Sequence, residues 1–138
     1  MARKITFHVE DINFKPPKAT PLSIWIEKVV QQEEKKLGTV SYVFCSDDYL
    51  HKINLEHLKH DTLTDIITFP YNRNPIEGDI FISIDRVRDN ANDFNVPFEV
   101  ELYRVIIHGI LHLCGYLDET DEQEAEMRHK EDMCLKML

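Results

Sequence analysis

Four short segments of the chain show the alternating period or the compact apolar stretches that are typical of β-strands. These segments are residues 5–9, 40–45, 65–69 and 79–84. Pro70 directly follows the third segment and predicts its end, and the turn-forming residues 72–75 separate it from the fourth. We therefore expect the third and fourth strands to form a hairpin.

Longer segments carry apolar residues at helical spacing. They predict helices over residues 22–37, about 47–58, 85–94 and 98–114. Gly38 and Gly115 stand where the first and last of these helices should stop, and Pro97 stands at a first helical position. Thr120 and Gln123 form a capping box that begins a final helix.

Strands and helices alternate only in part along the chain, which indicates an α+β protein. A length of 138 residues with 43% hydrophobic residues is enough for one compact core. We expect residues 1–138 to form a single small domain with a mixed sheet of about four strands and four to five helices. The nearly wholly apolar helix at residues 98–114 should be its buried central helix.

The charge balance is acidic and unevenly distributed. The chain has 16 Lys and Arg against 25 Asp and Glu, a net charge of −9, which argues against a protein that coats nucleic acid through a basic face. Residues 116–138 hold eight acids and three bases, so we expect the final helix to present a solvated acidic face. A polyanion should then approach along residues 57–60, Arg86, Arg88 or Arg104.

Three further features indicate a cytoplasmic protein. No apolar run reaches the roughly 18 residues of a membrane span, so no membrane partner is expected. The N-terminus has no apolar core of a signal peptide. Cys45, Cys114 and Cys134 are odd in number and lack C-x-x-C spacing, which is typical of reduced thiols.

The chemistry of the chain centres on the sequence His-x3-His-x2-Gly-x2-Asp. His108 and His112 are four residues apart, so they lie on one helix face with Cβ atoms roughly 5–6 Å apart. Gly115 lets the backbone leave the helix, and Asp118 is the first hard ligand after that turn. Three ligands leave a fourth position open, as in catalytic rather than structural zinc sites.

Two other interpretations of this segment are less consistent with the sequence. Chance pairs of histidines are mostly surface residues, whereas this helix is interior, and buried imidazoles need partners. The zinc-protease motif H-E-x-x-H has its general base directly after the first histidine, but that position is Gly109 here. A metzincin-like hydrolase acting by that mechanism is therefore disfavoured, and a metal site is favoured over a satisfied core pair.

The segment 108–116, HGILHLCGY, resembles the signature H-G-x-L-H-L-x-G-Y of the YbeY family of bacterial rRNA maturation factors. Upstream, Asn54 and the segment 64–70 (TDIITFP) are similar to the family's helix asparagine and its T-D-V-L-S-F-P segment. Residues 78–83 (GDIFIS) resemble its G-D-I strand. The resemblance covers roughly residues 50–120, and the chain length fits as well.

The resemblance implies an α+β metal-dependent endoribonuclease, specific for single-stranded RNA, in 16S rRNA 3′-end maturation and 30S subunit quality control. The implied partners are rRNA and the 30S ribosomal subunit, with no DNA. It further implies one Zn²⁺ per chain on His108, His112 and Asp118, where the family normally has a third histidine; Leu117 stands where an aspartate usually precedes it. The carboxylate of Asp118 should widen the choice to other divalent metals.

A second departure from the family concerns substrate binding. Leu58 stands at the position of a family arginine that faces the substrate, so Lys59, His60 and Asp65 become the candidates for this role.

Hydrolysis would use a metal-bound water. Three candidates remain for the general base of this reaction: the metal-bound hydroxide itself, Asp65 and the 2′-OH of the RNA. The alternative function is a ribosome-assembly binding factor whose metal site is mainly structural.

Overall fold

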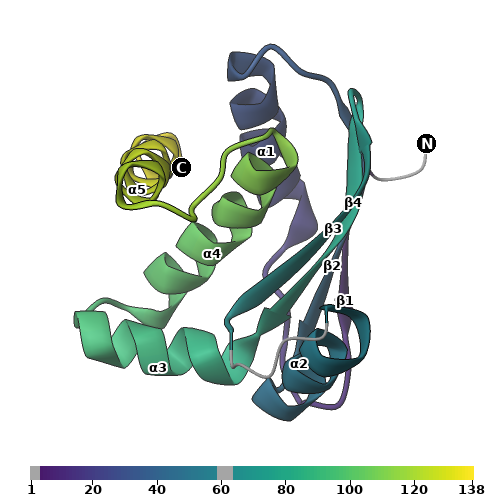
Figure 1. Cartoon of the computed structure of the whole chain (residues 1–138), viewed down its shortest axis with the longest axis vertical. Helices are drawn as coiled ribbons and strands as arrows, with labels where there is room; N and C mark the ends of the chain where they lie inside the picture. Colours follow the sequence, from purple (N-terminus) through teal and green to yellow (C-terminus); the bar gives the residue numbers. More distant parts are fainter. Residues whose placement is uncertain (1–3, 59–63) are drawn as a thin grey trace.

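The computed structural model describes residues 4–58 and 64–138, and its centre is a four-stranded sheet (Figure 1). The strands are β1 (Ile5–Val9), β2 (Leu37–Cys45), β3 (Ile66–Arg73) and β4 (Ile76–Ser83). Their spatial order is β1-β2-β4-β3. β1, β2 and β4 run parallel, and β3 is antiparallel to β4. The mixed sheet and the β3–β4 hairpin confirm the prediction.

Five α-helices and one π-helical turn surround this sheet within the described residues. They are α1 (Ala19–Gln32), α2 (Asp47–Ile53), the π-helical turn η1 (Asn54–Leu58), α3 (Ile84–Phe94), α4 (Phe98–Leu113) and α5 (Asp121–Leu135). α4 lies between the sheet and α5 (Figure 1). The α+β class is confirmed. None of the helices in the described ranges is long and apolar enough to cross a bilayer.

α4 is the buried central helix that the apolar pattern predicts. Ile106, Ile107 and Ile110 have no exposed surface. The hydroxyl of Tyr42, on β2, donates to the backbone carbonyl of Ile106 at 2.8 Å, which ties the helix to the middle of the sheet. Gly115 follows the helix with φ = +110°, a conformation that glycine adopts without strain.

Several predicted boundaries are wrong, and tertiary contacts explain the two largest differences. α1 ends at Gln32, and Gly38 lies within β2 rather than at a helix end, because Leu37 pairs with Ile76 and is buried. β3 does not stop before Pro70 but continues to Arg73. β3 is an edge strand, where a residue without an N–H group does not interrupt the sheet.

α5 is only partly the solvated acidic face that its composition suggests. Thr120 and Gln123 form the predicted capping box. However, Met127, Glu131 and Cys134 are buried, so one stripe of the helix packs inward. The final helix therefore delivers a buried carboxylate to α4. All three cysteines are free, as expected.

Candidate metal centre

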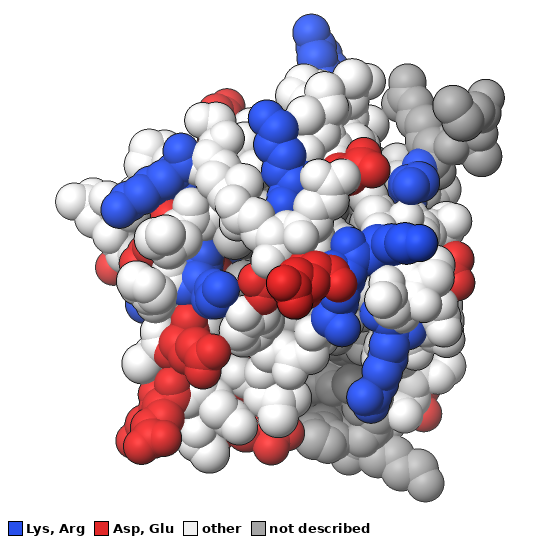
Figure 2. All heavy atoms as spheres, turned by 90° about the horizontal axis from the view of Figure 1, so that it is seen from above, with Lys and Arg blue, Asp and Glu red and all other residues white. Residues whose placement is uncertain are grey.

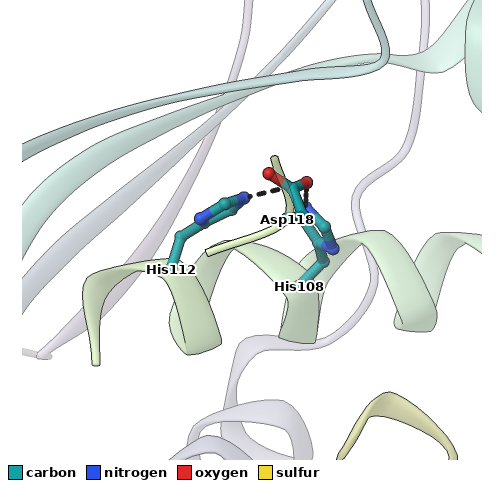
Figure 3. Close-up of side chains that lie close together, drawn as sticks. All are labelled: His108, His112 and Asp118. Atoms are coloured by element: carbon teal, nitrogen blue, oxygen red, sulfur yellow. Dashed lines mark ion pairs between the residues drawn. The ribbon is translucent and has the colours of Figure 1, made fainter. Parts of the chain in front are cut away.

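One turn of α4 and the loop after it bring the three predicted ligands together (Figure 3). The rings of His108 and His112 have centroids 4.5 Å apart and planes at 80°. Asp118 reaches over them from the loop, with Oδ2 3.3 Å from Nε2 of His108 and 3.4 Å from Nε2 of His112. The three donor groups lie within 4.8 Å of one another.

This donor set fits a zinc-sized cation. Ligands held tetrahedrally at about 2.0–2.1 Å from a common ion lie about 3.3–3.4 Å from each other. The two separations measured from Asp118 agree with that spacing. The side chains of His108, His112 and Asp118 are 18%, 22% and 38% exposed, so the centre is reached from solvent. The three residues together could hold one ion with access to an exchangeable fourth position.

A buried carboxylate, Glu131, supports the first of these histidines. His108 Nδ1 donates to Glu131 Oε2 at 2.6 Å, which directs Nε2 towards Asp118. Arg104 donates from Nη1 to Glu131 Oε1 at 2.9 Å, and from Nη2 to Asp132 at 2.6 Å. Metal-binding histidines are commonly oriented by such a carboxylate on the other ring nitrogen. Glu131 and His108 supply the protein part of a carboxylate–histidine–metal triad, which an ion bound to Nε2 would complete.

Glu131 is absent from the site predicted from the sequence, although its position in the final helix indicates that it is buried. Glu131 lies four residues after Met127 and three before Cys134, so it falls on the apolar stripe of an otherwise polar helix. A carboxylate on a buried stripe requires a partner in the interior. The stripe alone does not indicate which partner.

The protonation of the two histidines follows from their surroundings. Burial lowers the pKa of His112, and the neighbouring His108 lowers it further, so the neutral ring that a metal requires is favoured. Burial alone would also lower the pKa of His108, but the hydrogen bond and charge of Glu131 raise it above its usual value. The raised pKa favours the protonated ring of His108 when no ion is bound, so an ion that binds at Nε2 must displace a proton there, while Nδ1 keeps its proton on Glu131.

Glu131→Gln is expected to weaken metal binding by about 10- to 100-fold, because the charged partner that orients His108 is lost. The dissociation constant is measured by competition with a chelating dye. Glu126→Gln, an exposed position on the same helix, is the control. Equal affinities of the two variants would show that Glu131 does not support the centre.

A cavity of about 310 Å³ opens beside the ligands. Its wall includes His108, Asp118 and Asp65, and the last of these directly precedes β3. Asn90 Nδ2 donates to Asp65 Oδ2 at 3.3 Å, and burial raises the pKa of the Asp65 carboxyl, partly opposed by His108. The structure thus places Asp65 in the same cavity as two of the candidate ligands.

The other two substrate candidates from the sequence, Lys59 and His60, lie outside the described residues. Leu58 ends the π-helical turn that precedes them.

Two of the arginines expected to meet a polyanion are held by carboxylates. Arg86 Nη2 lies 2.6 Å from Asp47 Oδ2, and Arg104 is engaged by Glu131 and Asp132. Arg88 lies over the ring of Phe98, 5.4 Å from its centroid. On the face seen in Figure 2, basic and acidic side chains are interspersed, and no continuous basic band runs across it.

The helix position where a zinc protease carries its glutamate is packed against the sheet. A Cβ atom on Gly109 would lie 2.9 Å from Ile80 Cδ1 and 3.1 Å from Ile66 Cδ1. Gly109 is therefore the residue that allows α4 to approach β3 and β4 closely. A protease-type general base has no room at this position, in agreement with the sequence analysis.

The fold and these ligands define a class of protein: a small α+β chain with a candidate metal centre on a buried helix. Comparison with known families narrows this class, because the model of the family Endoribonuclease YbeY matches residues 5–138. The chain belongs to this family. The resemblance inferred from the HGILHLCGY segment is thereby confirmed.

Individual proteins that are similar to this chain support this family assignment. The chain is 58% identical to Endoribonuclease YbeY of Flavobacterium johnsoniae over 115 residues, which is 83% of each chain. It is 52% identical to Endoribonuclease YbeY of Flavobacterium psychrophilum, over 97% of this chain and 96% of the relative. A Thermotoga maritima protein with a solution structure has 31% identity and a TM-score of 0.64, over 96% of this chain and 87% of that one.

Proposed function

We propose that this protein is a zinc-dependent endoribonuclease that hydrolyses phosphodiester bonds of single-stranded RNA. The observation that carries the proposal is the ligand group His108, His112 and Asp118, oriented by Glu131, in a chain of the Endoribonuclease YbeY family. We place its action in the cytoplasm, in 16S rRNA 3′-end maturation and 30S subunit quality control.

The donor set supports zinc as the resident ion. Two imidazole nitrogens and one carboxylate oxygen are ligands that zinc accepts, and the spacing fits tetrahedral coordination. When bound, such an ion activates water and neutralises charge that develops on the phosphate. Asp118 in place of a third histidine adds a hard oxygen ligand, so we also expect binding of other divalent metals.

Asp65 is the residue that we propose as the proton acceptor. It shares the cavity with His108 and Asp118. Since Asn90 donates to Oδ2, Oδ1 is the atom that takes up the proton of the attacking water. Burial raises the pKa of Asp65, and a base works best when its pKa approaches the working pH.

The charge distribution supports an RNA that is presented by a partner rather than captured alone. The net charge is −9, and Arg86 and Arg104 are engaged by carboxylates. We therefore propose the 30S ribosomal subunit as the partner, and we expect weak binding to naked RNA at physiological salt.

Removal and return of the metal tests this function. Chelation of the purified protein should abolish cleavage of a single-stranded RNA, and one equivalent of Zn²⁺ per chain should restore it. A duplex of the same sequence should stay intact. Cleavage that persists after complete metal removal would refute the proposal. RNA binding without cleavage, together with a sharp fall of the melting temperature on chelation, would instead favour a ribosome-assembly factor with a structural metal.

A further inference from the structure

The face of the sheet opposite α4 carries a second hollow, separate from the metal-side cavity. Side chains alternate along β3 and β4, so Ile66 and Ile80 face Gly109 of α4 while Phe69 and Phe81 point to the other side. On that side they pack with α2 in a small hydrophobic cluster. A pocket of about 350 Å³ opens above this cluster.

Aromatic rings dominate the wall of this pocket. Its lining residues are Tyr49, Ile53, His57, Phe69, Tyr71 and Phe81, with Asp79 at the rim. The rings of Phe69 and Phe81 meet edge to face at 5.7 Å, and the His57 ring meets Phe69 in the same way at 6.2 Å. These contacts hold the rings in a fixed arrangement. The pocket is small enough for one planar group rather than a large ligand.

The polar groups of the pocket select the kind of ligand. The Tyr71 hydroxyl donates to Asp79 Oδ2 at 2.7 Å, although the Tyr71 side chain is 67% exposed. The carboxylate of Asp79 accepts hydrogen bonds and repels a phosphate. A ligand that fits is flat, uncharged and carries N–H donors on its edge. An unpaired nucleobase with an exocyclic amino group has these properties.

The pocket is also connected to the metal centre by one strand. β3 is the edge of the sheet, and Asp65, which directly precedes it, lines the metal-side cavity. Phe69 lies four residues further along, about 14 Å at about 3.4 Å per residue. A single strand of RNA that passes around the β3 edge can therefore reach both faces, whereas the two strands of a helix cannot separate to do so without unpairing.

We infer that the aromatic pocket of Phe69, Tyr71 and Phe81, with Asp79 at its rim, binds an unpaired amino-bearing base of the RNA whose backbone lies at the metal centre. This inference rests on the proposed function and adds a base-binding subsite to it. The subsite favours adenine, guanine or cytosine over uracil, because uracil has no exocyclic amino group and its single edge donor, N3–H, is flanked by two carbonyl oxygens that the Asp79 carboxylate repels.

Fluorescence of a base analogue tests the subsite without turnover. We would place one 2-aminopurine in uridine 10-mers and titrate them, at low ionic strength where naked RNA binds more tightly, with full-length His112→Ala protein, which is expected not to cut. Stacking in the pocket is expected to quench the analogue. Combining Tyr71→Ala with His112→Ala in one protein should abolish the quenching. It should also raise Kd about 5- to 150-fold, the range for one base–aromatic stack. Tyr71→Phe keeps the ring and should keep most of the affinity.

Ile24→Ala, at an exposed apolar position on α1, is the matched control and should change neither signal. Replacement of 2-aminopurine by purine riboside, which keeps the ring but lacks the amino group, should weaken binding because the hydrogen bond to Asp79 is lost. Unquenched fluorescence at saturation, or equal Kd values for Tyr71→Ala and Ile24→Ala, would overturn the inference. Because no cleavage is measured, these results are independent of the metal-removal experiment.

Discussion

His112→Ala should eliminate RNA cleavage and strongly reduce metal binding while the protein stays folded. The substitution removes one of three ligands, and the two that remain, His108 and Asp118, cannot hold the ion in a fixed geometry. Loss of several kcal/mol of electrostatic stabilisation by the ion corresponds to a decrease in kcat of about a thousandfold or more. The His112 side chain is 22% exposed, so little core packing is lost.

The measurement combines metal content by mass spectrometry, cleavage of a single-stranded RNA and thermal unfolding. His129→Ala is the control, because His129 is an exposed histidine on α5 outside the ligand group. We expect this control to match the wild type in all three measurements. Full metal occupancy in His112→Ala, or unchanged cleavage at equal purity, would refute the ligand assignment.

Gly109→Glu should destabilise the protein by about 3 kcal/mol or more. The first side-chain atom would already lie 2.9 Å from Ile80 and 3.1 Å from Ile66, so α4 would be displaced from the sheet. A carboxylate among these isoleucines would also lack a hydrogen-bond partner. Urea unfolding followed by circular dichroism measures the free energy of unfolding. The variant would carry the motif H-E-x-x-H at residues 108–112, but we expect no peptidase activity from it.

Gly109→Ala separates the steric cause from the electrostatic one. Overpacking by one methyl group costs about 1–3 kcal/mol, and the higher helix propensity of alanine returns about 1 kcal/mol. We therefore expect a net loss of at most about 2 kcal/mol in the same assay. A Gly109→Glu protein as stable as the wild type would show that α4 does not approach the sheet this closely.

Local features account for the parts of the fold that sequence analysis predicted correctly. The capping box of Thr120 and Gln123 and the apolar pattern of α4 depend on neighbours within one helical turn. The candidate metal ligands also depend on local spacing, because His108 and His112 share a helix face before any tertiary contact forms. Asp118 lies beyond the helix, and it reaches the two histidines only because the chain turns at Gly115.

Contacts between distant segments account for the errors. Leu37 joins β2 because of its partner Ile76, which lies 39 positions further along the chain. β3 continues through Pro70 because only one of its sides has a neighbouring strand. The burial of Glu131 depends on how α5 packs on α4, 23 residues away from His108. In each case the partner lies in a distant segment, so local spacing in the sequence does not identify it.

The sequence by itself indicated the α+β class through the order of its elements, and the central helix and candidate ligands through short-range spacing. It indicated the family through the resemblance of its motifs to a known signature. Only the tertiary structure decided which second carboxylate orients His108, that Asp65 lies beside the centre, and that Phe69 and Phe81 form a pocket behind it. These features arise where strands and helices far apart in the chain meet. Their positions follow from packing, which no single segment specifies.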